Sequence, residues 1–532
     1  MRVCNIKEHN VGQLYCWSAT LRPCGPHSRG RLCHIREESL ASAGQFSVSS
    51  LGGDPVRRLT KVYSAFIAML LVMAGAWAEE PALPAGLGGD EPALPAGLGT
   101  TEPSLPSGLG NAEEPALPTG LAGDTEATTP EDAPRAGLRE RLALHGFWET
   151  RAAVRTQSDP AQSKDTPLAE SRLQLETLQH WGPVELGAKA DVYLDGVLEQ
   201  AVFDLRQLQL TWSPLDNVDL RVGRQTLTWG TGDLIFINDL FPKDWQSFLA
   251  GRDEEYLKAP SDAIRVGLFT DLVNVNFAYT PQFDPDRFIT GERISYYNPM
   301  KGRTSGSDEQ ADFNAPSTWF QDDEFALRLY RNIGSYELAA YAYSGYWKSP
   351  GGQRMLPMQA TFPKLSVYGA SLRGTVGKGI GNIEVGYYDS RQDRGGDKVL
   401  INNSEFRLLI GYEQELATEL TGGFQYYLEH MMDYDDYRDT LLFFMDARDQ
   451  DRHLLTARLT KLLMNQDLTL SFFAFYSPSD GDAYLRPKAT YKLNDTWTLE
   501  GGGNVFLGIA QHSFFGQFED NSSVFASIRA SF

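Results

Sequence analysis

The chain ends on the stretch Val524-Phe-Ala-Ser-Ile-Arg-Ala-Ser-Phe532, and this stretch decides the expected fold. Alternate residues are apolar on one side and polar on the other, with Val524, Ala526, Ile528, Ala530 and Phe532 opposite Ser527, Arg529 and Ser531. Such period-2 alternation is typical of a β-strand with two unlike faces. The same pattern recurs in eighteen segments from about His145 onward, each roughly ten residues long.

A soluble β-sandwich would also alternate, so the connections between the segments are the better guide. Every second connection is short, as at Trp181–Pro183, Asn332–Gly334 and Met464–Gln466, whereas those between are mostly long, as at Gly230–Ser261, Gln282–Gln321 and Met431–Asp449. One rim of the sheet therefore carries tight turns and the other carries long excursions, which is the pattern of an outer-membrane barrel. We predict an all-β, closed antiparallel up-and-down transmembrane β-barrel of about eighteen strands over residues 139–532.

The first 78 residues read as leader sequence. Arg57-Arg58 and Lys61 precede an apolar run, Val62–Met73, and small residues follow it up to Ala78, as in a secretory signal peptide over residues 56–78. Signal peptides begin at the chain start, so we expect residues 1–55 to be a non-native upstream extension. A genuine long leader is the alternative. All four cysteines, Cys4, Cys16, Cys24 and Cys33, lie in residues 1–55.

Residues 79–138 contain a proline- and glycine-rich repeat that begins at Glu80, Glu91, Glu102 and Glu114. Proline and glycine disfavour helix and strand, so we expect a disordered N-terminal extension. The segment contains eleven acidic residues and one basic residue, Arg135, a composition that suits a solvated tether. The alternative is four copies of a docking motif for a periplasmic partner, anchored by leucines such as Leu83.

Composition excludes several classes of protein. The 532 residues carry a net charge of −21, which argues against nucleic acid as a partner. No run is long enough for a transmembrane helix. The sequence contains no G-x-S-x-G, H-E-x-x-H or phosphate-binding loop motif, and no C-x2-C pair, so we expect no enzyme activity, no metal site and no cofactor. A serine–histidine pair assembled from distant strands is the enzymatic alternative.

Two motifs carry a family resemblance. Val222-Gly-Arg-Gln-Thr-Leu-Thr-Trp-Gly230 contains Gly223, Arg224, Gln225, Trp229 and Gly230 at the spacing G-R-Q-x-x-x-W-G, and Gly146-Phe-Trp-Glu-Thr-Arg151 opens the predicted barrel. The chain thus resembles porin-like outer-membrane β-barrel proteins, including the alginate-export group and related uncharacterised families. The resemblance implies a barrel that conducts a solute, and it does not transfer alginate as that solute. The terminal Phe532 resembles the signal read by the bacterial barrel-assembly machinery, which we expect as a partner.

In a membrane barrel the apolar face meets lipid and the polar face lines the lumen. This assignment turns fourteen basic and fourteen acidic side chains inward, including Arg221, Arg265, Arg328 and Arg373. The last five strands and the first form a contiguous wall with seven basic groups and two acidic ones. These seven groups, the predicted basic wall, are Arg151, Arg155, Arg458, Arg486, Lys488, Lys492 and Arg529. Arginine suits carboxylate and phosphate ligands; the alternative is that these groups pair with glutamates and hold the wall together.

The predicted loop Gly230–Ser261 is too apolar for a fully solvated loop. If it folds inward, Phe236, Phe241, Trp245 and Phe248 become a candidate constriction; packing on a partner or on the rim is the alternative. We therefore expect a porin-like channel for a polar solute or polymer, anionic ones included, in the bacterial outer membrane. Lipid and lipopolysaccharide would surround it, and the N-terminal extension would lie in the periplasm. A component of an export or envelope-assembly system, recruited through the repeats, is the alternative function.

Overall fold

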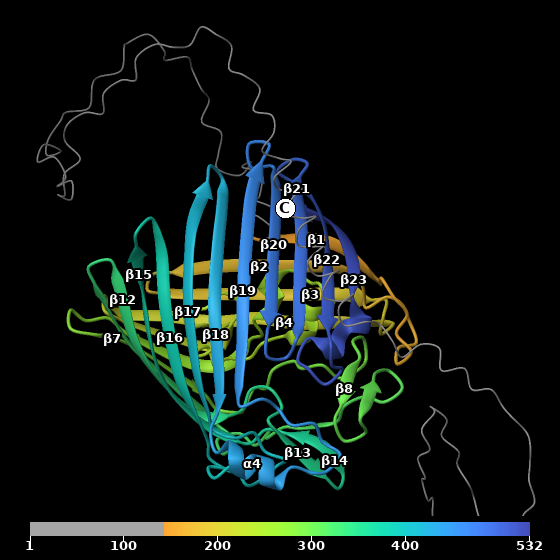
Figure 1. The fold of residues 1–532 in the computed structure, drawn as a ribbon. Coiled ribbons are helices and arrows are strands. Elements are labelled where there is room, and N and C mark those ends of the chain that lie inside the picture. The colour runs from red at the N-terminus through yellow and green to blue at the C-terminus, as the bar shows by residue number, and fades with distance from the viewer. Residues whose placement is uncertain (1–142) are drawn as a thin grey trace, which may run out of the picture. The chain divides into compact units, whose positions relative to one another are not determined.

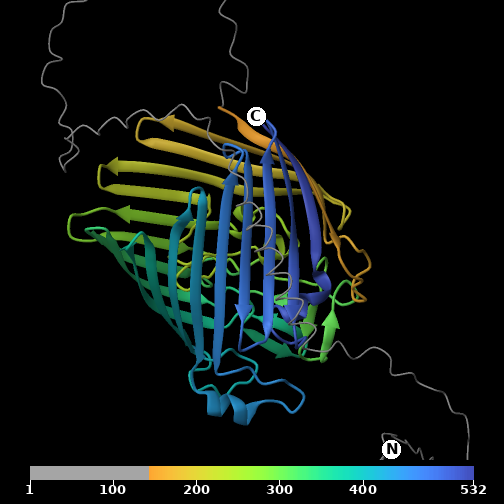
Figure 2. The same ribbon diagram turned by 45° about the horizontal axis from the view of Figure 1, so that its top comes forward.

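The computed structural model describes residues 143–532, which form a closed barrel of eighteen antiparallel strands (Figures 1 and 2). The predicted barrel architecture and strand number are confirmed. The segments 1–55, 56–78 and 79–138, with the repeats, lie outside the described residues, as do residues 139–142 at the predicted barrel start.

The barrel strands are β1 (His145–Arg155), β2 (Leu168–Trp181), β3 (Val184–Asp195), β4 (Gln200–Leu215), β5 (Val218–Gln225), β6 (Ser261–Leu268), β7 (Asn274–Thr280), β11 (Glu324–Ile333), β12 (Tyr336–Tyr346), β15 (Lys364–Val376), β16 (Gly379–Ser390), β17 (Glu405–Ala417), β18 (Leu420–Met431), β19 (Asp451–Leu463), β20 (Leu468–Ser477), β21 (Asp482–Lys492), β22 (Trp497–Gly508) and β23 (Ser523–Ser531). Each strand pairs with the next barrel strand along the chain. The barrel closes where β23 pairs with β1, from Phe147↔Ser531 to Arg155↔Ser523. Closure leaves no free sheet edge around the ring.

The remaining elements lie in the connections. They are α3 (Trp245–Ala250), η1 (Glu254–Leu257), β8 (Tyr296–Asn298), β9 (Arg303–Ser305), β10 (Phe313–Asn314), β13 (Gly352–Met355), β14 (Met358–Thr361), α4 (Tyr434–Thr440) and η2 (Gly516–Asn521). Strands β8 and β9 form a hairpin, and β10, β14 and β13 form a small three-stranded sheet. In residues 143–532, every helix is too short or too polar to cross a membrane.

The two rims of the barrel differ as the connection lengths predicted. Short turns join strand pairs such as β2–β3 and β17–β18 on one rim, where the backbone N–H groups of Gly146 and Phe532 donate to each other's carbonyl oxygens. The other rim carries the long connections with α4, β13 and β14, at the bottom of Figure 1. Two connections on this second rim are short, residues 196–199 and 478–481.

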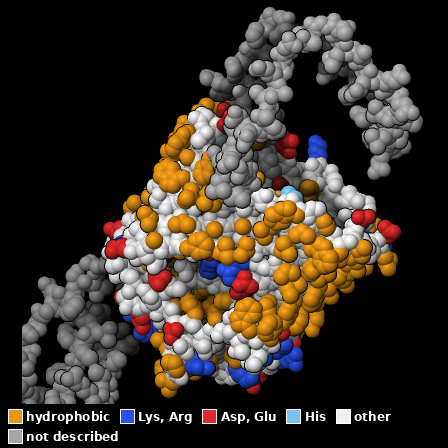
Figure 3. Space-filling model, turned by 180° about the vertical axis from the view of Figure 1, so that it is seen from behind, with side chains coloured by type: hydrophobic (Ala, Val, Ile, Leu, Met, Phe, Trp, Pro, Cys, Tyr) orange, Lys and Arg blue, Asp and Glu red, His pale blue; other side chains and the backbone are white. Residues whose placement is uncertain are grey.

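The outer face of the barrel is apolar. Large hydrophobic side chains stay exposed along alternate positions of the strands, among them Leu194, Phe203, Tyr368 and Val524. Figure 3 shows such side chains gathered in a broad band over one face. Many inward positions hold buried polar groups instead, such as Arg151, Glu170 and Glu384. This inside-out arrangement is the one expected for a barrel surrounded by lipid.

Three neighbouring strands of the barrel wall are short. β5, β6 and β7 contain eight, eight and seven residues, whereas the preceding β4 contains sixteen. Arg224 of β5 pairs with Leu208 of β4, and β4 continues beyond this pair to Gln200 without a β5 partner. Arg287, from the connection 281–323, forms two hydrogen bonds of 2.8 and 2.9 Å with the Asp204 carboxylate on this part of β4. Connecting segments therefore complete the wall here.

Candidate functional site: the barrel lumen

The connection between β5 and β6, residues 226–260, folds into the barrel, and we call it the inner segment. Its buried side chains, including Ile237, Phe241, Phe248 and Leu257, share one hydrophobic core with inward residues of the barrel strands. The strand residues of this core lie on twelve strands and are Ala263, Ala278, Ala326, Tyr343, Leu365, Val367, Tyr388, Leu409, Tyr427, Leu454, Phe473, Phe475, Tyr484 and Phe506. The inner segment therefore occupies the lumen and contacts wall around much of its circumference.

On one side of the lumen, Glu384 of β16 holds the inner segment. Its carboxylate accepts hydrogen bonds from the backbone N–H and hydroxyl of Thr231 at 2.7 and 2.9 Å, and from the backbone N–H and side-chain amide of Asn238 at 2.8 and 3.0 Å. Gly230 lies beside this carboxylate with φ +84°, a conformation that favours glycine. Glu384 thus satisfies donors at two turns of a segment that no strand pairs with.

Two further strands hold Asp233 of the inner segment. The Gln425 side chain of β18 accepts from the Asp233 backbone N–H and donates to its carbonyl oxygen, both at 2.8 Å. Arg458 of β19 binds the Asp233 carboxylate through Nε at 2.6 Å and Nη2 at 3.0 Å. A planar guanidinium that makes two parallel bonds fixes both the position and the orientation of the carboxylate.

On the opposite side, a buried network of ion pairs joins the inner segment to β2 and β3. Arg252 ion-pairs with Glu170, which also binds Arg172 at 2.7 Å. Arg172 binds Asp191 at 2.5 Å and stacks over the ring of Tyr256 at 4.5 Å. Buried charges are costly unless they are paired and hydrogen-bonded, and here each has an opposite partner. The inner segment is therefore fixed to both sides of the lumen.

The predicted constriction residues all lie on this segment. Phe241 and Phe248 are buried, and Phe236 and Trp245 pack against the same core. Phe248 contacts Tyr484 of β21 edge-on, with 5.7 Å between the ring centroids. Trp245 begins α3, where the Asp244 carboxylate accepts from the Ser247 backbone N–H and caps the helix. The structure thus brings the four aromatic residues together inside the barrel; their role in selectivity stays a prediction.

The predicted basic wall meets acidic partners. Five of its members form ion pairs with Glu149, Glu500, Asp233 or Glu254, and the last two of these acids belong to the inner segment; the pairs are Arg151–Glu149, Arg151–Glu500, Arg458–Asp233, Arg458–Glu254, Arg486–Glu254, Lys488–Glu500 and Arg529–Glu149. Arg155 donates to backbone oxygens of Lys164 and Arg293. Lys492 is exposed at the end of β21. The positive charge of this wall is therefore largely compensated.

The family-motif residues straddle the end of β5. Gly223 has φ +119°, and a Cβ there would lie 2.3 Å from the Leu208 carbonyl oxygen, so only glycine fits between the two strands. Arg224 binds Asp262 of β6 with two hydrogen bonds of 2.8 and 2.7 Å. The Gln225 side chain donates to the Ala263 carbonyl oxygen at 3.0 Å. These residues end the strand and turn the chain toward the lumen.

The second half of the motif lies in the inner segment. Trp229 packs edge-on against Phe241 with 4.9 Å between the ring centroids, and Gly230 lies at the Glu384 carboxylate. The motif thus combines a strand end with the first contacts of the segment that enters the barrel.

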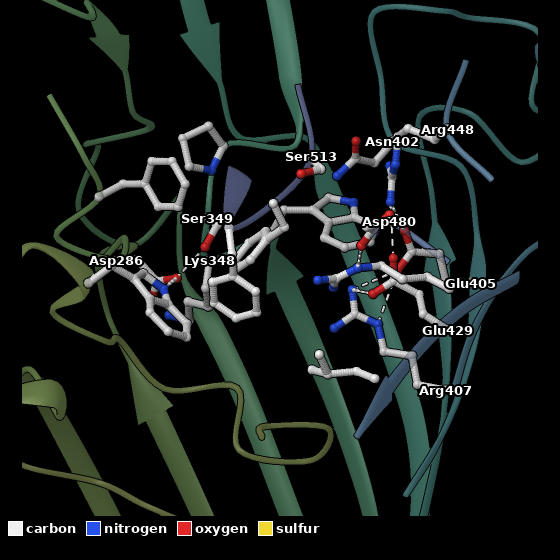
Figure 4. A pocket seen from close by; sticks show the side chains of 18 of the residues that line it. Asp286, Lys348, Ser349, Asn402, Glu405, Arg407, Glu429, Arg448, Asp480 and Ser513 are labelled. Carbon is white, nitrogen blue, oxygen red and sulfur yellow. Dashed lines mark hydrogen bonds and ion pairs between the residues drawn. The ribbon is translucent and has the colours of Figure 1, made fainter. Parts of the chain in front are cut away.

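A cavity of about 740 Å³ lies between the inner segment and the long connections. Aromatic rings line one part of it, including Phe236, Trp245, Phe288, Trp347 and Phe514. Three arginine–carboxylate pairs line another part: Arg407–Glu405 at 2.6 Å, Arg448–Glu429 at 3.0 Å and Arg452–Asp480 at 2.7 Å. Figure 4 shows this cluster on the opposite side of the cavity from Asp286, Lys348 and Ser349. The cavity is an aromatic and ionic vestibule on the rim of the long connections.

Burial shifts the pKa values of two charged groups beside the vestibule. It raises the pKa of Asp286, although Ser349 Oγ, Trp245 Nε1 and the Lys243 backbone N–H donate hydrogen bonds to its carboxylate. It lowers the pKa of Lys243, although the ammonium lies 3.1 Å from Asp239 Oδ1. Both shifts favour the neutral form, so it is energetically unfavourable for Asp286 and Lys243 to be charged at this position.

The sequence did not single out Glu170, Glu384 or Gln425, which hold the inner segment. Alternation places all three on the inner face, and nothing else in the local sequence distinguishes them from other inward polar residues. Within the part of the chain that the structure describes, no three His, Cys, Asp or Glu side chains are grouped to hold a metal ion.

No protein-family model matches the chain, and no curated protein matches its sequence. Among solved structures, it is similar to a triple mutant of the porin of Rhodopseudomonas blastica, at 11% identity and a TM-score of 0.32 over 73% of this chain and 99% of that one. It is also similar to OmpT, an outer-membrane protein of Vibrio cholerae, at 11% identity and a TM-score of 0.36 over 73% and 98% of the two chains. Similarity this low gives no guide to solute or activity.

Proposed function

We propose that this chain is a porin-like channel of the bacterial outer membrane, and that the inner segment narrows its lumen. The observation that carries the proposal is that residues 226–260 lie inside a closed barrel and are bonded to both sides of it, through Glu384 and through Arg252–Glu170. A segment fixed across the lumen reduces the cross-section through which water and solute pass. The apolar outer face supports a lipid environment.

The orientation follows from the rims. Outer-membrane barrels have short periplasmic turns and longer external loops, so we place the short-turn rim, with the chain end, at the periplasm. The long connections and the vestibule then face the cell exterior. Recruitment of a periplasmic partner through the repeats, recognition of Phe532 by the assembly machinery and contact with lipopolysaccharide stay predictions. Export through the same barrel is the alternative function and uses the same lumen.

We propose transport rather than catalysis. Within residues 143–532 no histidine ring hydrogen-bonds to a serine hydroxyl: the His430 and His453 rings bind Asp451 and Tyr426 instead. Most charged groups of the lumen form ion pairs along its walls, which suits a hydrated path lined by fixed charges.

Planar-bilayer recording tests the channel proposal. The mature barrel should give a small, steady conductance. A variant in which residues 231–249 are replaced by a short glycine–serine linker should give a several-fold larger one, because the lumen is cleared. Equal conductance in the two proteins would contradict a constricting role for the inner segment. A closed barrel that conducts only with an added periplasmic partner would favour the exporter.

A further inference from the structure

Two arginines face each other on the inner wall without acidic partners. Arg221 of β5 and Arg265 of β6 are directly opposite residues of the paired strands. Both occupy inward positions, because the next inward residue of β6, Ala263, belongs to the core inside the barrel. Among the described residues, no carboxylate forms an ion pair with either guanidinium. Like charges directly opposite each other destabilise a strand pair.

The surrounding groups compensate this pair only in part. Arg265 Nη2 donates to Asn276 Oδ1 of β7 at 3.1 Å, its one side-chain hydrogen bond to the described residues. The nearest inward acid on β5, Asp219, accepts from the Ser213 hydroxyl at 2.7 Å. Thr211, opposite Arg221 on β4, has a buried hydroxyl without a partner in the described residues. The site therefore presents donors and positive charge to the lumen.

Arg328 of β11 extends the row. It lies opposite Asn276, the residue to which Arg265 donates its hydrogen bond. Its Nη2 binds Glu337 at 2.6 Å, whereas its buried Nε has no partner in the described part of the chain. Three guanidinium groups thus lie on β5, β6 and β11, and Asn276 of the intervening strand β7 lies between the last two. We call Arg221, Arg265 and Arg328 the arginine row.

The arginine row lies on the periplasmic side of the inner segment. Ala263 and Ala326 occupy the next inward positions toward the outer rim on β6 and β11, and both pack in the core that contains the inner segment. The row is therefore separate from the predicted basic wall, where Arg458 and Arg486 pair with acids of the inner segment.

We propose that the arginine row binds the carboxylate or phosphate group of an anionic solute on the periplasmic side of the inner segment. A planar guanidinium donates two parallel hydrogen bonds to such a group, and two facing guanidinium groups can bind one oxyanion together. The anion would supply the negative charge that the wall lacks here and relieve the repulsion between Arg221 and Arg265. Its role as a selectivity step for transport rests on the proposed channel function; binding itself does not.

Isothermal titration of the detergent-solubilised mature barrel with inorganic phosphate tests the binding. The double variant Arg221→Gln/Arg265→Gln should bind phosphate about tenfold or more weakly, because each charge-assisted contact contributes on the order of a factor of ten. Arg265→Lys keeps the charge and loses the planar fork, so its affinity should lie between those of the wild type and the double variant. Arg331→Gln removes an arginine from the exposed end of β11 and is the matched control, with unchanged affinity. Heat-modifiable mobility on a gel confirms that each variant has closed its barrel.

Reversal potentials in a potassium chloride gradient test the role in transport. The double variant should shift the reversal potential toward cations, and Arg331→Gln should not. Wild-type phosphate affinity in a folded double variant would overturn the proposed site. A barrel that binds phosphate through these residues but never conducts would keep the site and overturn the channel.

Discussion

Arg458 on β19 binds the carboxylate of Asp233, a residue 225 positions earlier in the chain, through two hydrogen bonds of 2.6 and 3.0 Å. The contact joins the wall of the barrel to the segment inside it. It also shows how the lumen is made nearly neutral: acids brought in by the inner segment meet arginines that the strands turn inward.

Asp233→Asn should leave Arg458 without its main counter-charge. Both side chains are partly exposed, so we expect a loss of at most about 1 kcal/mol in barrel stability. The freed guanidinium should move the reversal potential toward anions. The matched variant Asp495→Asn removes an acid from the β21–β22 turn on the short-turn rim, outside the lumen, and should leave the reversal potential unchanged. A shift toward cations in Asp233→Asn would contradict the arrangement.

Glu384→Ala should release the inner segment. The part-buried donors of Thr231 and the buried donors of Asn238 lose their acceptor, which costs up to roughly 1–3 kcal/mol for each unsatisfied buried group. Trypsin should then cut the folded barrel at Lys243 or Arg252, which are buried in the intact protein. Glu413→Gln changes an exposed carboxylate on the neighbouring strand β17 and serves as the control. Equal resistance to trypsin in Glu384→Ala and the wild type would rule out this anchoring role.

Arg252→Gln should destabilise the packing of the inner segment against β2 by about 3–5 kcal/mol, because Glu170 stays buried with less positive charge around it. The measurement is the temperature at which the barrel loses its heat-modifiable mobility. Arg394→Gln breaks an exposed pair with Asp389 and should change this temperature little. Similar melting of both variants would argue that the buried network contributes little.

Leu210→Arg places a charge on the outer face of β4, where the leucine is 45% exposed. At the middle of a bilayer such a change costs about 2–4 kcal/mol, and near the interface about 0–1 kcal/mol. Leu215→Arg, at the end of the same strand on the short-turn rim, is the graded control. Folding yield into liposomes should fall much more for the first variant. The reverse order would mean that this face does not meet lipid as proposed.

Asp286→Asn tests the shifted pKa beside the vestibule. Because burial raises the pKa of Asp286 in the folded state, the folded barrel binds this proton more tightly than the unfolded chain does. This contribution to stability is present below the ordinary aspartate pKa and is lost as pH rises through the folded value. The variant should therefore gain stability relative to wild type as pH rises above the ordinary aspartate pKa. A pH-independent difference in melting temperature would exclude the shift.

Alternation along the strands predicted the barrel because each strand has one face toward lipid and one toward the lumen. The same rule placed Arg458 and Arg221 correctly on the inner side. It could not predict that Arg458 has an acidic partner and that Arg221 has none in the described part of the chain. The partner, Asp233, lies on a connection whose path no local sequence pattern encodes. The apolar content of residues 230–261 suggested an inward fold, but its anchors, Glu384 and Glu170, look like any other inward glutamates in the sequence.

The short strands β5, β6 and β7 have a consequence for the surrounding bilayer. Seven or eight tilted residues cover less hydrocarbon than the sixteen of β4, so the apolar girdle narrows abruptly on this flank. The bilayer can respond by thinning beside these strands, or the barrel can tilt in the membrane. Either response makes the side of the barrel formed by β5, β6 and β7 differ from the rest in its contact with lipid.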